Sequence, residues 1–94
     1  EILGISGMKI LKGLAKVRRV ESIRELIREA KVGSTQVYTK LPLLEKLGYI
    51  IVKMEPPDPN PKEIVITERG LQIAEIIRKL DSEIEKDAEK LKES

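Results

Sequence analysis

The residues best suited to chemistry in this sequence are polar side chains gathered between positions 34 and 46. The amide of Gln36 can pair with adenine, Thr39 can meet a thymine methyl group, and Lys40 can reach a guanine or a phosphate. Tyr38 is suited to donate its hydroxyl to a phosphate. This is the chemistry of nucleic-acid recognition, although an ordinary polar surface helix carries the same residue types.

The segment from Ser22 to Ile50 must position these side chains. Ser22 and Glu25 form a capping box, which predicts a helix start, and apolar residues then recur at helical spacing. We expect Val32-Gly33 to make a tight turn with positive φ at the glycine, and Ser34 to cap a second helix. The inner faces of the two helices would be Ile23, Leu26, Ile27 and Ala30, then Val37, Leu41 and Leu44.

A short helix held across a partner helix can enter a DNA major groove, so double-stranded DNA is the expected partner. With the inner face buried, the second helix turns Thr35, Thr39 and Lys46 outward and places Gln36, Tyr38 and Lys40 on its flanks. Pro42 lies inside this helix and removes an amide donor, so we expect a kink or break there.

The rest of the chain supplies four further elements. An apolar arm (Ile2, Leu3, Ile5) precedes a helix that Ser6 would cap, and residues 18–21 form a short extended link or one short strand. Residues 49–54 and 62–67 have strand chemistry and flank a loop with four prolines in seven positions, which indicates a hairpin with a stiff tip. Thr67 would cap a long helix from about Glu68 to Glu93.

This order predicts an α+β fold, a winged helix-turn-helix with a three-helix core, a β-hairpin wing and a long C-terminal dimerisation helix. Residues 1–67 would form the DNA-binding part with its N-terminal arm, and residues 68–94 the dimerisation helix, within one structural domain. The motif VYxxLxxLExxGYI, which starts at Val37, and the later Thr67-x-x-Gly70 resemble the PadR and MarR groups of winged-helix regulators over about residues 7–80. The resemblance implies that the second helix of the pair reads DNA and that the wing contacts phosphates.

The predicted DNA-binding residues are Ser34, Thr35, Gln36, Tyr38, Thr39, Lys40, Lys46, Arg24, Arg28, Lys53 and Lys62. The wing departs from the family pattern, because its tip carries Glu55 and Asp58 and only Lys53 and Lys62 flank it. A proline-rich tip of this kind is also suited to contact a neighbouring subunit. Arg24 and Arg28 would hold the DNA backbone, or would pair with nearby glutamates.

The long helix has a heptad-like apolar seam, which predicts a homodimer. The predicted interface residues are Ile73, Ile77, Leu80, Ile84 and Leu91. A helix of this length reaches about 39 Å, more than so small a domain can cover.

Charge and composition narrow the function classes. Residues 1–54 hold 11 Lys/Arg against 5 Asp/Glu, a balance of +6, whereas residues 55–94 hold 7 against 11, a balance of −4. The basic half suits a polyanion. The chain has no Cys and no His, so nucleophile–base pairs and metal sites built on them are absent; we expect no enzyme, no cofactor and no metal. We also expect a cytoplasmic, nucleoid-associated protein, and the abundance of Lys and Glu is typical of thermophiles.

The expected function is therefore that of a homodimeric, sequence-specific DNA-binding protein that regulates transcription. One alternative is a DNA-coating or partition protein that spreads along DNA from a centromere-like site through dimer–dimer contacts. Another is a winged-helix protein-interaction module, because fold alone does not separate these functions.

Overall fold

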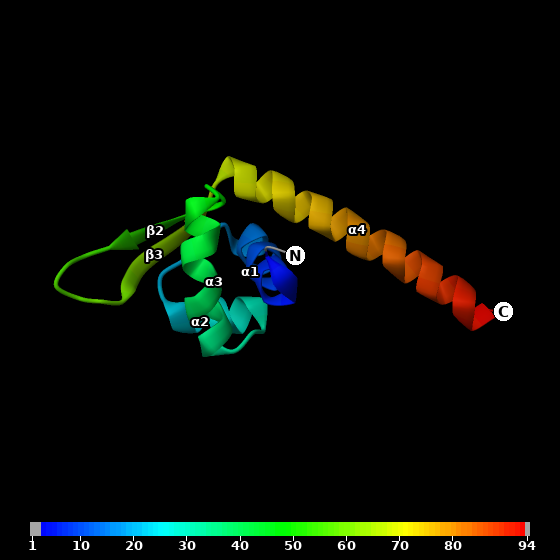
Figure 1. Ribbon diagram of the computed structural model, residues 1–94, viewed down its shortest axis with the longest axis horizontal. Coiled ribbons are helices and arrows are strands. Elements are labelled where there is room, and N and C mark those ends of the chain that lie inside the picture. Colours follow the sequence, from blue (N-terminus) through cyan, green and yellow to red (C-terminus); the bar gives the residue numbers. More distant parts are fainter. Residues whose placement is uncertain (1–2, 94) are drawn as a thin grey trace.

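The computed structural model describes residues 3–93 and contains four helices and a small antiparallel sheet. The helices are α1 (Gly4–Val17), α2 (Ile23–Ala30), α3 (Ser34–Lys46) and α4 (Glu68–Glu93), and the strands are β1 (Arg19–Val20), β2 (Ile50–Met54) and β3 (Pro61–Ile66). The strand order is β1-β3-β2. The wing, which comprises β2, β3 and their loop, leaves the helices in the opposite direction to α4 (Figure 1). This is the winged helix-turn-helix fold expected from the sequence.

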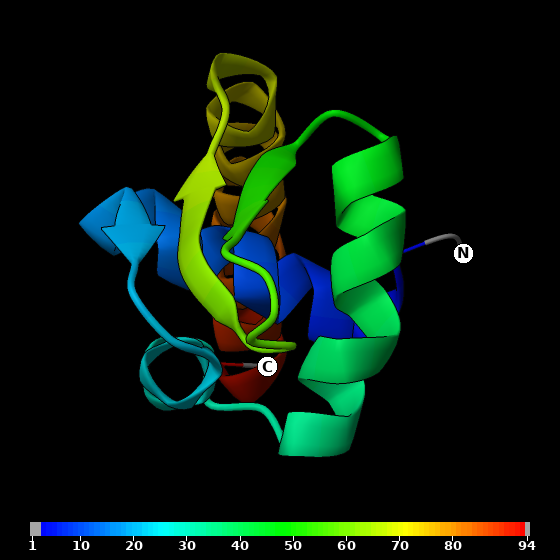
Figure 2. The ribbon, with the colours of Figure 1, turned by 90° about the vertical axis from the view of Figure 1, so that its left-hand side faces the viewer.

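The core is aliphatic and receives side chains from all the helices and strands. The largest fully buried side chains come from every element except α4, and α4 adds Ala74 and Ile77. They are Ile10, Leu11, Leu14, Leu26, Leu44, Ile50, Ile64, Val20 and Val37. In Figure 2, α1 lies behind the sheet and α3 stands beside the wing, so the inner faces of the helices converge on one core.

The first helix starts earlier than predicted. Ser6 does not cap it, because α1 begins at Gly4 with Leu3 in the capping position and without a side-chain cap. Gly7 donates its N–H to the carbonyl of Leu3 (3.2 Å), which adds the predicted arm to the helix. Ile5 is thus a helical residue, 74% exposed, and Ile2 lies outside the described residues.

The serine half of the capping box at α2 is confirmed, whereas the Glu25 side chain accepts the N–H of Glu21 and not that of Ser22. The hydroxyl of Ser22 accepts the N–H of Glu25 (3.1 Å). The turn after α2 also differs from the prediction. The positive φ falls on Lys31 (58°), whereas Gly33 is extended and occupies the N-cap position of α3, with no side-chain cap bond. Lys31 closes α2 by donating its N–H to Ile27 (2.9 Å). Because this left-handed C-cap completes the reversal, Gly33 does not need positive φ and Ser34 becomes the first helical residue.

Pro42 does not break α3. Helix α3 runs without interruption from Ser34 to Lys46, and Val37, Leu41 and Leu44 form its buried face as predicted. Pro42 lies on the exposed side of α3. Because proline has no N–H, the carbonyl of Tyr38 lacks its helical partner there, and water can hydrogen-bond it instead.

The two glycines of the recognised motifs join α4 to the end of α3. Gly48 has positive φ (80°) and ends the turn after α3. The hydroxyl of Thr67 donates to the carbonyl of Gly48 (2.6 Å) and accepts the N–H of Gly70 (3.0 Å), so Thr67 caps α4 as predicted. A Cβ at Gly70 would lie 2.1 Å from the carbonyl oxygen of Tyr49. Only glycine therefore allows this close approach of α4 to the start of β2.

Candidate nucleic-acid interface

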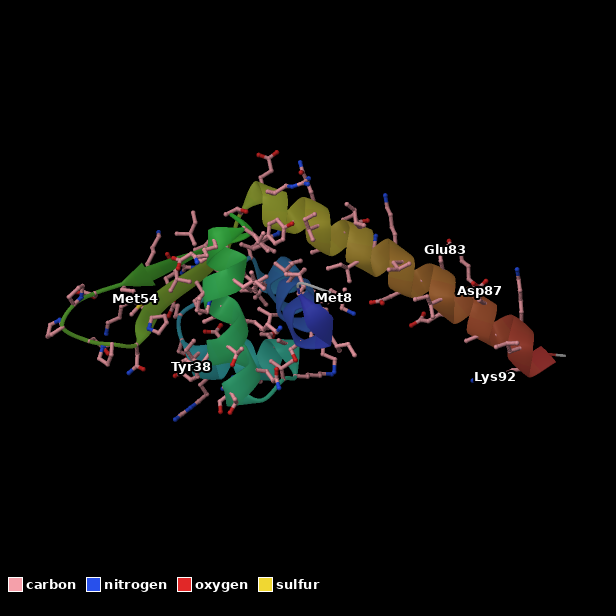
Figure 3. The ribbon with its side chains drawn as sticks, in the orientation of Figure 1. Met8, Tyr38, Met54, Glu83, Asp87 and Lys92 are labelled. Atoms are coloured by element: carbon pink, nitrogen blue, oxygen red, sulfur yellow. The ribbon has the colours of Figure 1, made fainter. Side chains whose placement is uncertain are left out.

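We call the exposed side of α3, together with one half-buried residue at its edge, the reading face. It consists of Ser34, Thr35, Gln36, Tyr38, Thr39 and Lys46, which are exposed, and Lys40, which is half-buried. Tyr38 is 54% exposed and points away from α1, on the side of the domain that also carries the wing (Figure 3). The exposure of these donors and acceptors follows from burial of Val37, Leu41 and Leu44 on the opposite side.

Two side chains of the reading face are held by neighbours. Ser6, on α1, donates its hydroxyl to Oε1 of Gln36 (3.1 Å), which leaves the amide hydrogens of Gln36 free to donate. Thr39 donates its hydroxyl to the carbonyl of Thr35 (2.8 Å), one turn earlier in the same helix. Sequence reasoning missed the role of Ser6, because nothing in its spacing indicates a contact thirty residues away.

A shallow notch lies where the starts of α2 and α3 meet the wing. We call it the phosphate notch; its lining residues are Ser22, Ile23, Arg24, Ile27, Ser34, Tyr38, Asn60 and Pro61. Its lining includes residues with hydroxyl, guanidinium and amide donors from the start of α2, from α3 and from the wing. Such donors make the backbone contacts that fix the register of a protein on DNA. Ser22 and Asn60 were not predicted for this site, because one is a helix cap and the other belongs to the proline loop.

Arg24 and Arg28 keep their charges available. Within residues 3–93, neither makes an ion pair. The nearby Glu21 pairs with Arg19, and Glu25 accepts the N–H of Glu21. Arg24 lines the phosphate notch, whereas Arg28 lies one turn further along α2, outside it.

The cations of the wing are already paired. Lys53 lies 2.9 Å from Glu63, which also binds Arg19, and Lys62 lies 3.0 Å from Asp58. The hydrogen bond from Lys53 lowers the pKa of Glu63, opposed by some desolvation. The backbone N–H of Asn60, followed by Lys62, lowers the pKa of Asp58. The wing therefore presents nearly balanced charge, in contrast to the two free arginines of α2.

The predicted seam on α4 divides into a covered and an exposed part. Ile77 is 7% exposed and belongs to the core of its own chain, and Ile73 packs against that core. Leu80, Ile84 and Leu91 are 55%, 56% and 78% exposed. Ile76, which the seam omitted, is 58% exposed; its spacing from Ile73 and Leu80 was the available signal.

The described residues contain no helix that combines the length and the apolar character required to cross a membrane. The long helix carries charged residues throughout, and Glu83, Asp87 and Lys92 lie along its far half (Figure 3).

Comparison with known proteins supports the fold. Neither a protein-family model nor a curated protein matches the sequence. Among solved structures, NadR in complex with 4-hydroxyphenylacetate has a TM-score of 0.68 at 20% identity over 93% of this chain, which spans 61% of NadR. Sso10a-2, a DNA-binding protein from Sulfolobus solfataricus, has a TM-score of 0.68 at 23% identity over 92% of both chains. Disulfide-formed AbfR has a TM-score of 0.59 at 17% identity, over 92% of this chain and 70% of AbfR. The chain thus shares the winged-helix fold of these three proteins.

Proposed function

We propose that this chain is a double-stranded DNA-binding protein that inserts α3 into the major groove. The observation that carries the proposal is the union of the reading face with the phosphate notch: base-reading side chains on α3 lie beside backbone-binding donors from α2, α3 and the wing. The first group supplies sequence preference and the second fixes orientation.

Two further observations support DNA as the partner. The free guanidinium groups of Arg24 and Arg28 belong to the basic half of the chain, residues 1–54, with its balance of +6. The likeness to Sso10a-2 extends over 92% of that DNA-binding protein. A binding protein without enzymatic activity, located with the nucleoid in the cytoplasm, agrees with both.

The protein acts as a homodimer in this proposal. Helix α4 continues past the core, and the molecule reaches 59 Å in its longest dimension against 24 Å in the others. Its exposed side chains Ile76, Leu80 and Ile84 would be covered by a second copy. Two reading helices about 34 Å apart would then occupy successive major grooves of a pseudo-palindromic site, as in other helix-turn-helix dimers.

Regulation of transcription through operator occupancy is the function we infer for such a dimer. Footprinting on duplexes selected from random sequence, at about 150 mM salt where non-specific binding is weak, tests it. One bounded footprint with two half-sites is expected. Absence of duplex binding under these conditions would contradict the proposal and favour a protein-interaction module.

A DNA-coating or partition function is the second candidate, and the wing favours it. Ile51 and Met54 are 50% and 49% exposed, and Met54 borders an apolar hollow with Pro59 and Pro61. An apolar, charge-balanced wing is better suited to protein than to phosphate. Protection that nucleates at one site and lengthens with protein concentration would select this function, with the wing as a dimer–dimer contact.

A further inference from the structure

A second basic surface lies on α1, where the proposed reading function does not use it. Lys9, Lys12 and Lys16 recur at steps of three and four and therefore share one side of the helix. The buried residues Ile10, Leu11 and Leu14 occupy the other side. The lysines thus face away from the core onto which α3 packs.

These lysines border a groove between α1 and the end of α2, here called the lysine groove. Its lining residues are Lys9, Lys12, Gly13, Lys16, Glu29, Ala30 and Lys31, and its volume is about 280 Å³. Gly13 brings the two helices together: a Cβ there would lie 3.0 Å from the Cα of Ala30. The groove is therefore a fixed feature of the α1–α2 packing.

The groove keeps an excess of positive charge. Lys12 is paired with Asp81 of α4, and Glu29 is the one acidic lining residue. Within residues 3–93, Lys9, Lys16 and Lys31 make no ion pair. Uncompensated lysines on a rigid surface are suited to an extended polyanion, whose bound counterions they displace.

The lysine groove and the phosphate notch lie at opposite ends of α2. The notch uses Ser22 to Ile27, at the start of the helix, and the groove uses Glu29 to Lys31, at its end. The notch is completed by α3 and the wing, whereas the groove is completed by α1. The two features therefore share no lining residue.

We propose that the lysine groove binds the phosphate backbone of a second DNA duplex, so that the protein joins two duplexes. This inference rests on the proposed function for the first duplex. From Lys9 to Lys16 the helix rises about 10 Å, and one DNA strand presents a phosphate about every 3.4 Å along the axis. The row of lysines from Lys9 to Lys16 thus spans several phosphates. Because it offers lysines without base-reading amides, this contact is independent of sequence.

A two-duplex capture experiment tests the proposal. A biotinylated duplex with the selected site is immobilised, and a labelled duplex of unrelated sequence is added with the full-length protein. The test variant is Lys9→Gln/Lys16→Gln, which leaves the Lys12–Asp81 pair and the left-handed Lys31 intact. The control variant Lys79→Gln/Lys90→Gln removes the same charge from exposed positions of α4.

The wild type and the control are expected to retain the labelled duplex. The test variant should keep its footprint on the first duplex. The amount of second duplex that it captures should fall at least about fivefold. The salt dependence of capture should also weaken, with the slope of log K against log[salt] reduced by about 1.8 for two lost phosphate contacts.

Three outcomes overturn the proposal. Equal capture by wild type and test variant would mean that the two copies of α3 in a dimer each bind one of the duplexes. Loss of dimer in the test variant, measured by sedimentation, would assign the lysines to the partner subunit. Preferential capture of single-stranded RNA would assign the groove to another nucleic acid. Failure of the wild type to bind even the first duplex would instead contradict the proposed function.

Discussion

At the scale of single residues, close backbone approach decides where α4 starts. Gly70 lies against the carbonyl of Tyr49, and Thr67 bonds both Gly48 and Gly70. The motif that suggested a winged-helix family is thus a packing device. Its two glycines and Thr67 orient the wing and the long helix relative to α3.

Substitution of Gly70 by alanine is expected to destabilise the fold by about 2 kcal/mol, a typical cost of overpacking. The added Cβ would meet a backbone oxygen at 2.1 Å, so the start of α4 must shift. Urea unfolding measures the loss. Gly33→Ala is the control, because no atom lies within 4 Å of its Cβ; an equal loss in both variants would show that the contact at Gly70 is not the cause.

The reading face makes a second residue-scale prediction. In the double variant Gln36→Ala/Thr39→Ala, affinity for the selected site should fall at least about 30-fold, since each good base contact discriminates by about 1–3 kcal/mol and two contacts are lost. Affinity for unrelated duplex should stay nearly constant, because the phosphate contacts remain. Competition binding measures both affinities, with Gln72→Ala/Ser82→Ala on α4 as the control. An unchanged preference for the selected site would show that other residues read the bases.

At the scale of elements, apolar periodicity and caps predicted the helices well. The inner face of α3 and the caps Ser22 and Thr67 are where the sequence placed them. The ends of β2 and β3 differ from the predicted strand ends by no more than one residue. Residues 19 and 20 form β1, which joins the sheet beside β3. Errors arose at helix ends, where Leu3 and Lys31 took conformations that depend on backbone hydrogen bonds and not on residue type.

The candidate site was only partly predictable. Exposure of the reading face follows from helical periodicity alone. The bond from Ser6 to Gln36 and the contribution of Asn60 to the phosphate notch each join segments distant in sequence. Local spacing contains no information about such contacts.

The ion pairs of the wing predict a specific acid response. Because the hydrogen bond from Lys53 holds the pKa of Glu63 below its usual 4.5, the carboxylate stabilises the fold above that pH. The contribution is lost as the pH falls through the lowered pKa. Wild type and Glu63→Gln should therefore differ in free energy of unfolding at neutral pH and converge in acid.

Urea unfolding between pH 7 and pH 3 measures this difference. The control is Glu85→Gln, which removes the same charge at an exposed position on α4. A difference between wild type and Glu63→Gln that does not vary with pH would contradict the stabilising role of the Glu63 pairs.

At the scale of the whole molecule, the proposed dimer depends on the exposed apolar side chains of α4. Ile77 belongs to the core of its own chain, so a dimer would be joined by the side chains that remain exposed, among them Ile76, Leu80 and Ile84. For the two copies of α3 in such a dimer to stay at a fixed separation, the two long helices must make a fixed contact.

The substitution Ile84→Lys should convert the dimer into a folded monomer at micromolar concentration. Ile84 is 56% exposed, so the change spares the core while placing a charge in the apolar interface. Sedimentation equilibrium measures the mass, and circular dichroism checks the fold. Ser82→Lys, on the opposite side of α4, should remain dimeric; a monomeric wild type would contradict the predicted interface.

The central claim is that α3 enters the major groove, and methylation protection on the selected duplex tests it most directly. Dimethyl sulfate modifies guanine N7 in the major groove and adenine N3 in the minor groove. We predict protection of guanine N7 in two patches about one helical turn apart. Protection confined to adenine N3, or binding that leaves guanine N7 fully reactive throughout the footprint, would contradict the account.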